Sequence, residues 1–415
     1  MKRLFYILAG VCLLFAAESC KHSSKIDVPV IASGDVVVVG GGPAGVSAAY
    51  AAAREGAKTV LIERDGCLGG LWTSGLVLPL NASRALEKDG VTRQSCTGIM
   101  GEMVARLEAL GMMSQNEDRS GPAPDPEATK YVLQCMLEEV GVQVIYYALA
   151  CDAVMDGNKI KAVILETKSG RLAVTGSQFV DCTGDGDLFA WAGEDFELRK
   201  YHVGAMYRIG GVPDDMKLGT RTPLPGVRNM NVRSEYDQDG LDVLNVSRLQ
   251  GLIRKRIWEE TQSFRQREGG QNIYLLDTPA KLGVRMTRVL KGQYCVTLDD
   301  SMNWTEFPDC IGLSGRDATA TYKGRDYRWK ERPFWQIPYR SLLPRKTGNL
   351  LVAGRCCCFD EGLTWDAREV GTCIVTGQAA GTAAALCVRE NTSPSALSVD
   401  LLRGVLKTRS VRLEF

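Results

Sequence analysis

The chain is poor in histidine and nearly neutral in charge. Its 415 residues include two histidines, His22 and His202, and 50 basic against 49 acidic side chains give a formal charge of +1. A balanced charge gives no electrostatic reason to bind nucleic acid, so no nucleic-acid partner is expected. Any histidine-based acid–base chemistry in the body of the chain depends on His202.

The fourteen cysteines lack the spacings of redox or cluster sites. The absence of any Cys-x-x-Cys pair excludes a thioredoxin-like couple and an iron–sulfur ligand set that can be recognised from spacing. No metal site is predicted. Several cysteines stand inside apolar strands or helices and are interpreted as small buried hydrophobic residues: Cys135, Cys182, Cys295, Cys373 and Cys387.

Long apolar runs are absent from the body of the chain, but one lies at the N-terminus. Lys2-Arg3 precede the apolar stretch 4–17, and Glu18-Ser19-Cys20 follow it, as in a secretory signal. A small residue before a cysteine resembles the lipobox of bacterial lipoproteins, although Glu18 and the lack of a leucine three residues before Cys20 depart from it. A cleaved secreted protein and an uncleaved anchor are the alternatives.

The lipoprotein interpretation predicts a place for the protein. Residues 1–20 are then a signal peptide, 21–33 a polar tether, and a lipid on Cys20 is the contact with a membrane. The expected location is the cell envelope, periplasmic or associated with the outer membrane. Export to an oxidising compartment would also permit disulfides among the remaining cysteines.

The segment from Asp35 to Glu63 has every part of a dinucleotide-binding unit. A β-branched strand (36–39) leads into Gly40-Gly41-Gly42-Pro43-Ala44-Gly45, an alanine-rich helix (43–55), a second strand (59–62) and a terminal acid. We expect Gly40 to make the tight turn, Gly42 to admit a pyrophosphate and Gly45 to let helix and strand pack closely. Glu63 lies 23 positions after Gly40, where a carboxylate can accept hydrogen bonds from a ribose.

The residues after Glu63 indicate which dinucleotide is bound. Arg64-Asp65-Gly66-Cys67-Leu68-Gly69-Gly70 resembles the acid-to-double-glycine signature of FAD enzymes with the glutathione-reductase-like fold. Gly69 and Gly70 would let the backbone pass the FAD diphosphate without a Cβ in the way. A plain loop turn is the alternative.

The middle of the chain predicts a helix at 129–141 and a strand at 142–147. Strand-like pieces follow at 150–155, 159–166, 171–174 and 177–181, separated by turn residues, as in an antiparallel meander that returns to a parallel sheet. The strand ending at Asp181 leads into a glycine-rich turn, in which Thr183, Gly184 and Asp185 are predicted to contact FAD. A simple turn and a cation-binding loop are the alternatives, but a calcium loop needs more oxygen ligands.

Residues 191–332 lack the strand–glycine–helix pattern and predict a smaller α+β substrate domain. Strands are expected at 203–209 and 292–298, with a charged helix near 249–267. The pattern returns with a strand at 349–355 ending in Gly354 and a helix at 369–388 that begins with a capping box at Asp366 to Glu369. Gly371, Gly377 and Gly381 would let this helix pack tightly, and its N-terminus would face the flavin.

Together these motifs resemble the FAD-dependent oxidoreductase family related to the flavoprotein component of heterodisulfide reductase. Met206 to Val212, Lys281 to Arg285 and Gly377 to Gly381 add to the resemblance, which covers nearly all of residues 34 to 390. It implies an α/β fold: a Rossmann-like FAD-binding domain with a parallel sheet and an inserted antiparallel meander (34–190 and 333–390), the substrate domain, and a tail (391–415). Gly354 and Gly371 are expected to contact FAD.

The resemblance leaves the chemistry open. His202, Arg285 and Arg368 are the catalytic candidates, the arginines for orienting a carboxylate or stabilising flavin charge. Cys356-Cys357-Cys358 are placed in a loop expected to face the flavin, which raises the idea of a redox dithiol. No second strand-GxGxxG-helix unit follows residue 70, so NAD(P)H is the less expected electron partner.

Two functions of different class remain open. One is an enzyme that oxidises or reduces an organic small molecule by hydride transfer through flavin N5. The other is a flavin-bearing accessory or electron-transfer lipoprotein without substrate turnover, whose redox partner protein the sequence does not identify.

Overall fold

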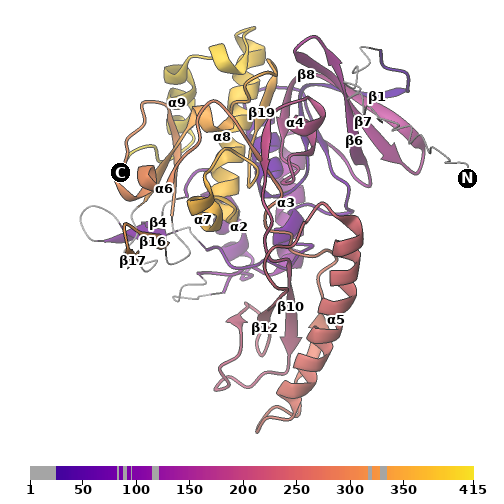
Figure 1. Ribbon diagram of the computed structural model, residues 1–415, viewed down its shortest axis with the longest axis vertical. Helices are drawn as coiled ribbons and strands as arrows, with labels where there is room; N and C mark the ends of the chain where they lie inside the picture. Colours follow the sequence, from indigo (N-terminus) through magenta and orange to yellow (C-terminus); the bar gives the residue numbers. More distant parts are fainter. Residues whose placement is uncertain are drawn as a thin grey trace, which may run out of the picture.

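The computed structural model describes residues 25–81, 84–86, 91–94, 96–114, 121–315, 320–327 and 334–415. The predicted signal peptide, Cys12, Cys20, His22 and the start of the tether lie outside these ranges. The described part of the chain folds into a larger domain around a mixed sheet and a smaller one that extends from it (Figure 1).

A seven-stranded sheet forms the centre of the larger domain, in the order β5-β2-β1-β8-β7-β6 with β19 also beside β8. Five strands are mutually parallel: β1 (Val30–Val39), β2 (Thr59–Ile62), β5 (Gln143–Ile145), β8 (Gly170–Asp181) and β19 (Leu350–Val352). The antiparallel β6 (Leu149–Asp156) and β7 (Lys159–Thr167) form the inserted meander. The predicted Rossmann-like parallel sheet with an antiparallel insert is therefore confirmed.

Two boundaries in this sheet differ from the prediction. The pieces expected at 171–174 and 177–181 are one strand, β8, which pairs with β1 on one side. On its other side it pairs with β7 up to Thr175 and with β19 from Phe179. β1 begins at Val30 rather than near residue 35, so residues 30–33 belong to the sheet and not to the tether.

Helices α1 (Pro43–Arg54) and α8 (Val370–Arg389) cross in close contact. A Cβ at Gly377 would lie 2.1 Å from the Ala44 carbonyl oxygen, and one at Gly381 would lie 2.0 Å from that of Ala48. These glycines therefore permit the predicted backbone packing. Within the described ranges, α8 alone is long and apolar enough to span a membrane, but its residues 370–387 are all buried inside the protein, as in a core helix.

The remaining helices of the larger domain pack around α1 and α8 or against outer strands. They are α2 (Ile99–Ala109), α3 (Pro126–Glu139), α4 (Asp187–Trp191), α6 (Leu298–Met302), α7 (Thr364–Ala367) and α9 (Val399–Thr408). The predicted helix at 129–141 is thus α3, shifted by about one turn. Residues 391–415 are no tail, because Leu402 and Leu406 of α9 are buried in the main core.

The smaller domain packs one long helix on an antiparallel sheet of order β11-β12-β10-β13. The strands are β11 (Thr220–Arg221), β12 (Arg228–Arg233), β10 (Gly204–Gly210) and β13 (Tyr274–Asp277), and the helix is α5 (Val243–Arg265). Leu249, Ile253 and Ile257 of α5 are buried at intervals of about one turn and form its core with the sheet.

The smaller domain ends earlier than the predicted residue 332. Its core is built from residues between Val203 and Leu282, whereas Leu290, Val296 and β15 (Cys310–Ser314) belong to the main core. β15 pairs with β18 (Trp335–Pro338). The strand predicted at 292–298 is wrong: β14 covers Arg288–Leu290, pairs with β9 (Phe196–Leu198), and α6 starts at Leu298. Two short hairpins, β3–β4 (Arg84–Leu86, Thr92–Gln94) and β16–β17 (Ala320–Tyr322, Arg325–Tyr327), complete the described elements.

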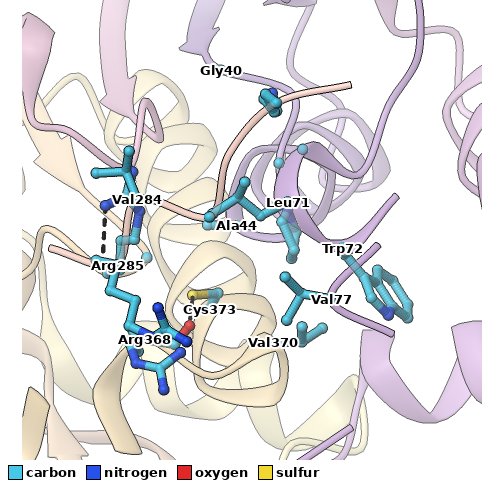
Figure 2. Close-up of a pocket in the computed structure, with 18 of the residues that line it drawn as sticks. Gly40, Ala44, Leu71, Trp72, Val77, Val284, Arg285, Arg368, Val370 and Cys373 are labelled. Atoms are coloured by element: carbon cyan, nitrogen blue, oxygen red, sulfur yellow. Dashed lines mark hydrogen bonds between the residues drawn. The ribbon is translucent and has the colours of Figure 1, made fainter. Parts of the chain in front are cut away.

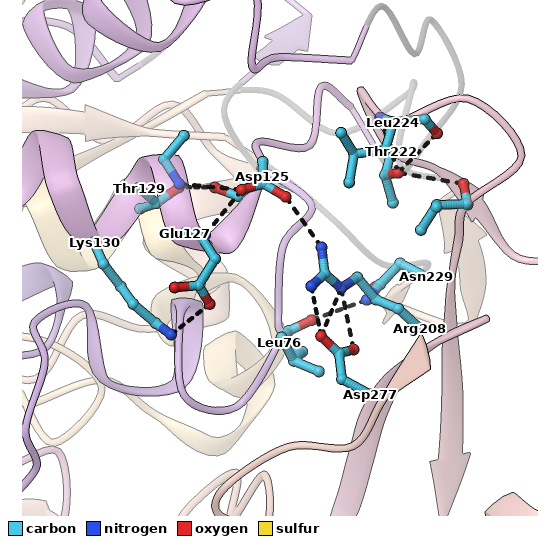
Figure 3. Close-up of polar contacts among 12 residues, drawn as sticks. Leu76, Asp125, Glu127, Thr129, Lys130, Arg208, Thr222, Leu224, Asn229 and Asp277 are labelled. Carbon is cyan, nitrogen blue, oxygen red and sulfur yellow. Dashed lines mark hydrogen bonds and ion pairs between the residues drawn. The ribbon is translucent and has the colours of Figure 1, made fainter. Parts of the chain in front are cut away.

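A buried arginine joins the two domains (Figure 3). Arg208 of β10 donates from Nη1 to Asp125 at 3.1 Å and from Nε to both oxygens of Asp277 at 3.1 Å. Asp125 in turn caps α3 by accepting hydrogen bonds from the Glu127 and Ala128 amides at 2.9 and 3.1 Å. One guanidinium thus connects the second sheet to the N-terminus of a helix in the larger domain.

Candidate active site

A cavity of about 680 Å³ lies where the carboxyl ends of β1, β2, β8 and β19 meet the second sheet. Residues of the larger domain line one wall, which we call the glycine wall: Gly40, Gly42, Pro43, Ala44, Glu63, Arg64, Gly70, Thr183, Gly184, Asp185, Gly354 and Arg355. Residues of the smaller domain and of the α7–α8 junction line the opposite wall, which we call the second wall: Met206, Asn229, Asn231, Arg233, Lys281 to Arg285, Trp365, Arg368, Glu369 and Val370. The structure thus collects most of the predicted site residues around one space (Figure 2).

Gly40, Gly42 and Gly45 of the first loop have three different roles. Gly40 has a φ of +98°, and a Cβ there would lie 2.5 Å from the Cys182 carbonyl oxygen. A Cβ at Gly45 would lie 1.7 Å from the Gly40 carbonyl oxygen, so this glycine packs the helix and does not line the cavity. Gly42 has no atom within 4 Å of its missing Cβ and lines the cavity. The open space at Gly42 fits a ligand that approaches the main chain closely.

The N-terminus of α1 adds donors to this wall. Its first residue is Pro43, its N-cap is Gly42, and no side chain caps it. The free amides and the positive end of the helix dipole therefore remain available for phosphate oxygens.

Glu63 stands at the end of β2 and is 4% exposed. Its carboxylate accepts hydrogen bonds from the Gly41 amide at 2.6 Å and the Asp65 amide at 2.8 Å. Burial raises the pKa of Glu63, against the opposing effect of the amides and of Lys281, which forms an ion pair with Asp65. The acid predicted to hold a ribose is thus fixed at the cavity edge by the same loop that would hold the phosphates.

Asp181 fixes the turn that follows β8, a role the sequence did not reveal. It is fully buried, accepts hydrogen bonds from the Thr183 amide and hydroxyl at 2.9 and 2.7 Å, and accepts another from the Phe189 amide at 2.9 Å. Burial raises the pKa of Asp181 to about 6. These bonds hold Thr183 and Gly184 against the cavity.

Asp185 and Asp187 are engaged by arginines. Asp185 accepts hydrogen bonds from Arg355 and from the Thr287 hydroxyl, both at 2.7 Å, and Asp187 pairs with Arg288 at 2.8 Å. Burial acts to raise the pKa of Asp185, but Arg355 and Thr287 outweigh it and lower the pKa. The described residues contain no group of three His, Cys, Asp or Glu that could hold a metal ion.

Arg285 and Arg368 lie together on the wall opposite the glycine loop, as Figure 2 shows. Arg285 donates from Nη1 to the His202 carbonyl oxygen at 3.0 Å. Arg368 stacks over the Trp365 ring at 4.8 Å and lies 3.2 Å from Glu369. The buried Nε of each has no hydrogen-bond partner among the described residues. Burial, and then the charges of Arg368 and Arg233, lower the pKa of Arg285 to about 9.

His202 does not line the cavity and is 1% exposed. The rings of Tyr201, Tyr236 and Trp365 surround it at centroid distances of 5.2, 4.7 and 5.7 Å. Burial, followed by the charges of Arg285, Arg233 and Arg368, lowers its pKa to about 4. The predicted catalytic base is therefore a neutral ring packed behind the arginines, and the structure gives it no path to a bound ligand.

Gly69 and Gly70, the second glycine pair, have different roles. Gly70 lines the cavity, and a Cβ there would lie 3.0 Å from the Gly42 Cα. Gly69 has a φ of +98° and donates its amide to Gly41 at 2.8 Å, so it supports the loop from behind. The pair therefore brings a second stretch of main chain beside the first.

Two details of the predicted C-terminal motif are wrong. Gly371 faces Cys96, whose Sγ would lie 2.8 Å from a Cβ, and it does not line the cavity. The capping box is absent, because Glu369 is the N-cap of α8 without a side-chain cap and Asp366 belongs to α7. The helix still begins at the cavity, since Val370 lines it.

The cysteine triplet also stands elsewhere than expected. Cys356, Cys357 and Cys358 are buried and do not line the cavity. Burial raises the pKa of Cys356 and Cys357 well above the ordinary range, which opposes a reactive thiolate. Cys182 and Cys373 line the cavity instead.

All twelve described cysteines are free. Cys182, Cys373 and Cys387 are buried as predicted, but Cys135 is half-buried and Cys295 exposed.

Several lining residues carried no motif in the sequence. Asn229, Asn231 and Arg233 come from β12, and Trp365 comes from α7. Asn229, Asn231 and Arg233 reach the cavity because the second sheet folds over the first, and no local pattern encodes this or the position of Trp365.

The family follows from comparison with known proteins. Residues 35–222 and 217–406 match the model of the FAD dependent oxidoreductases. The chain belongs to this family. It is an FAD-dependent oxidoreductase, and the glycine wall described above fits the adenosine diphosphate part of FAD.

Individual relatives resemble this flavoenzyme less completely. The mitochondrial dihydrolipoyl dehydrogenase of Pisum sativum is 44% identical over 61 residues, which are 14% of this chain and 12% of the relative. The tRNA uridine 5-carboxymethylaminomethyl modification enzyme of Zymomonas mobilis is 30% identical over 163 residues, which are 35% of this chain and 25% of the relative. A flavoprotein/dehydrogenase structure from Cytophaga hutchinsonii has a TM-score of 0.48 at 13% identity and covers 91% of this chain and 84% of its own. The matches thus span a quarter or less of these curated relatives.

Proposed function

We propose that this flavoenzyme oxidises or reduces an organic small molecule bound between the glycine wall and the arginines of the second wall. The observation that supports this is one continuous cavity of about 680 Å³, which joins an FAD-type clamp to side chains of a separate domain. Bound FAD would supply a two-electron site that exchanges hydride with the substrate through its N5 atom.

The chain's own residues would have distinct tasks. The main chain at Gly40, Gly42 and Gly70, with the amides of α1, would hold the phosphates, and Glu63 the ribose. Leu71, Trp72, Val77 and Val370 would keep water from the middle of the cavity, where Figure 2 shows them opposite Arg285. His202 does not line the cavity, and the carboxylates of Asp185, Asp187 and Glu369 that do are paired with arginines. The substrate is therefore expected to lose its proton without a dedicated histidine.

The decisive experiment combines a spectrum with anaerobic reduction. The purified protein should be yellow with about one FAD per chain, and one member of a panel of organic acids, alcohols, amines and sugars should bleach it without oxygen. FAD-loaded protein that no organic compound bleaches, but that a redox protein reduces, would replace the enzyme by the electron-transfer alternative.

We also propose that the enzyme works in the cell envelope, anchored by a lipid on Cys20. The support is the sequence of residues 1–20 alone, which lie outside the described ranges. Cells fed a radioactive fatty acid should label the wild-type protein and leave a Cys20→Ala variant unlabelled. Label on the variant, or none on the wild type, would overturn the anchor.

A further inference from the structure

The second wall of the cavity concentrates positive charge. Arg233, Arg285 and Arg368 all line it, and the charge of each acts on His202 behind them. In the described chain, the nearby acid that forms an ion pair with one of them is Glu369, which pairs with Arg368. Asp185 and Asp187, which also line the cavity, are held by Arg355 and Arg288. The wall therefore carries a net positive charge.

Arg285 is held in place without being neutralised. Its Nη1 donates to a carbonyl oxygen, that of His202, rather than to a carboxylate. Its Nε is buried and has no hydrogen-bond partner within the described ranges, and the same is true of the Nε of Arg368. Burying a cation without a full set of anionic partners costs free energy, and an anion bound against the cavity-lining atoms of these guanidinium groups would recover part of that cost. Two guanidinium groups facing one space suit the planar, forked geometry of a carboxylate.

The surroundings fit an organic acid rather than a bare inorganic ion. Figure 2 shows Val284 beside Arg285, and Leu71, Val77 and Val370 across the cavity from the two arginines. Trp365 lies under Arg368. An apolar lining next to two guanidinium groups matches a carbon skeleton that ends in a carboxylate.

We propose that the substrate is a small organic acid whose carboxylate is bound by Arg285 and Arg368, with Arg233 at the rim of the site. This inference rests on the proposed function and names its substrate class. His202 is a positioning residue in this arrangement: its carbonyl oxygen holds Arg285, and its ring packs on Trp365, which supports Arg368.

The test is a titration of the FAD-loaded protein with acetate, benzoate and inorganic phosphate, read from the flavin absorption spectrum. The carboxylates should perturb the spectrum and saturate, and phosphate should do so at least about tenfold more weakly. Arg285→Gln and Arg368→Gln should each weaken benzoate binding by about 10- to 100-fold, since each removes a charged hydrogen-bond donor. Arg285→Lys should fall between, because it keeps the charge and loses the fork.

Arg254→Gln is the matched control. Arg254 is exposed on α5 in the same domain and does not line the cavity. It changes the net charge by the same amount, so benzoate binding should stay within about twofold of wild type. Melting temperatures of all variants establish that they are folded.

His202 provides a second readout that works with or without FAD. It is the only histidine beyond residue 22, so in a His22→Asn protein its ring gives the single histidine signal in NMR. Benzoate bound between the arginines should reduce their repulsion and move the midpoint of the His202 titration to higher pH. The ring faces Arg233, Arg285, Arg368 and the rings of Tyr201, Tyr236 and Trp365, and an acid bound there is the change that raises its pKa.

Four results would overturn the inference. One is the absence of any saturable effect of carboxylates. Another is equal binding by Arg285→Gln, Arg368→Gln and Arg254→Gln. The third is a lowered flavin reduction potential in the arginine variants without any change in carboxylate binding, which would assign the arginines to the flavin. A yellow protein bleached by a neutral substrate would keep the proposed function and reject this substrate class.

Discussion

The two walls of the cavity are built from different materials. The glycine wall acts mainly through its main chain: Gly40, Gly42 and Gly70 have no Cβ that would keep a ligand away, and the first amides of α1 are free. The second wall is side chain: Arg285, Arg368 and Trp365 reach the space from separate segments. Main-chain geometry is tied to local sequence, and side-chain geometry here depends on how two domains meet. The identity of the cofactor was therefore predictable from the sequence, whereas the substrate was not.

The largest expected effect comes from valine substitutions in the first glycine loop, where Gly45 serves packing and Gly42 serves ligand binding. Gly45→Val should abolish folding or FAD binding altogether, because even its Cβ would lie 1.7 Å from the Gly40 carbonyl oxygen. Gly42→Val should fold, since that position has φ of −70° and open space, but it should weaken FAD binding at least ~100-fold by filling that space. Circular dichroism measures folding, and fluorescence titration with FAD measures the binding affinity. An unfolded Gly42→Val variant would contradict the assignment of packing to Gly45 and of FAD binding to Gly42.

The next effect concerns how the second wall is held in place. Arg208→Met should destabilise the protein by about 3–5 kcal/mol, because it leaves the buried Asp125 and the half-buried Asp277 without their cation. Urea unfolding measures this. Exposed Arg254→Met on α5 is the control and should change stability by less than about 0.5 kcal/mol. A small loss in Arg208→Met would mean that packing alone positions the second sheet.

A third comparison examines what supports the glycine wall from behind. Gly381→Ala should cost about 1–3 kcal/mol, because its Cβ would lie 2.0 Å from the Ala48 carbonyl oxygen of α1. The same change at exposed Gly404 of α9, where nothing lies within 4 Å, should stabilise by up to about 1 kcal/mol through helix propensity. Thermal or urea unfolding gives both values. Equal signs for the two substitutions would contradict the close crossing of α1 and α8.

The smallest expected effect is a pH dependence from a side chain inside the main-chain wall. The pKa of Asp181 is about 6 in the folded protein and about 3.8 when unfolded, so the folded state holds the proton more tightly. Its contribution to stability is full below about pH 3.8 and is lost as the pH rises through 6.

The wild type should accordingly lose about 1.3 kcal/mol relative to Asp181→Asn between pH 5 and 7. Urea unfolding at the two pH values measures the difference. Parallel pH profiles for the two proteins would show that Asp181 is ionised throughout this range.

The sequence predicted the elements whose periodicity or glycines are local. The β1-α1-β2 unit and the meander match the structure because each is decided by neighbouring residues. The spacing of Gly377 and Gly381 on one helix predicted tight packing, although the partner helix α1 lies far away in the sequence. The errors arose where tertiary contacts decide. Gly371 is turned toward Cys96 by helix phase, and Glu369 rather than Asp366 begins α8.

His202 is a further case in which tertiary contacts, rather than local sequence, decide the role of a residue. A lone histidine at the start of a strand is a reasonable base, but the aromatic rings that enclose it come from Tyr236 and Trp365, far along the chain. Arg233 had no motif at all and became a lining residue through the register of β12 with β10. Such residues are identified only when the second sheet is in place.

The change of partners along β8 has a consequence for solubility. Up to Thr175 one edge of this strand is covered by β7, and from Phe179 by β19. Without the β6–β7 meander, the amides and carbonyls of residues 170–175 would form an open edge in the middle of the molecule, ready to pair with another chain. The inserted hairpin covers this segment and makes β6 the outer strand of the sheet instead. A shortened protein lacking residues 149–167 should therefore expose the edge of β8 and aggregate more than the full chain, even if its glycine wall is intact.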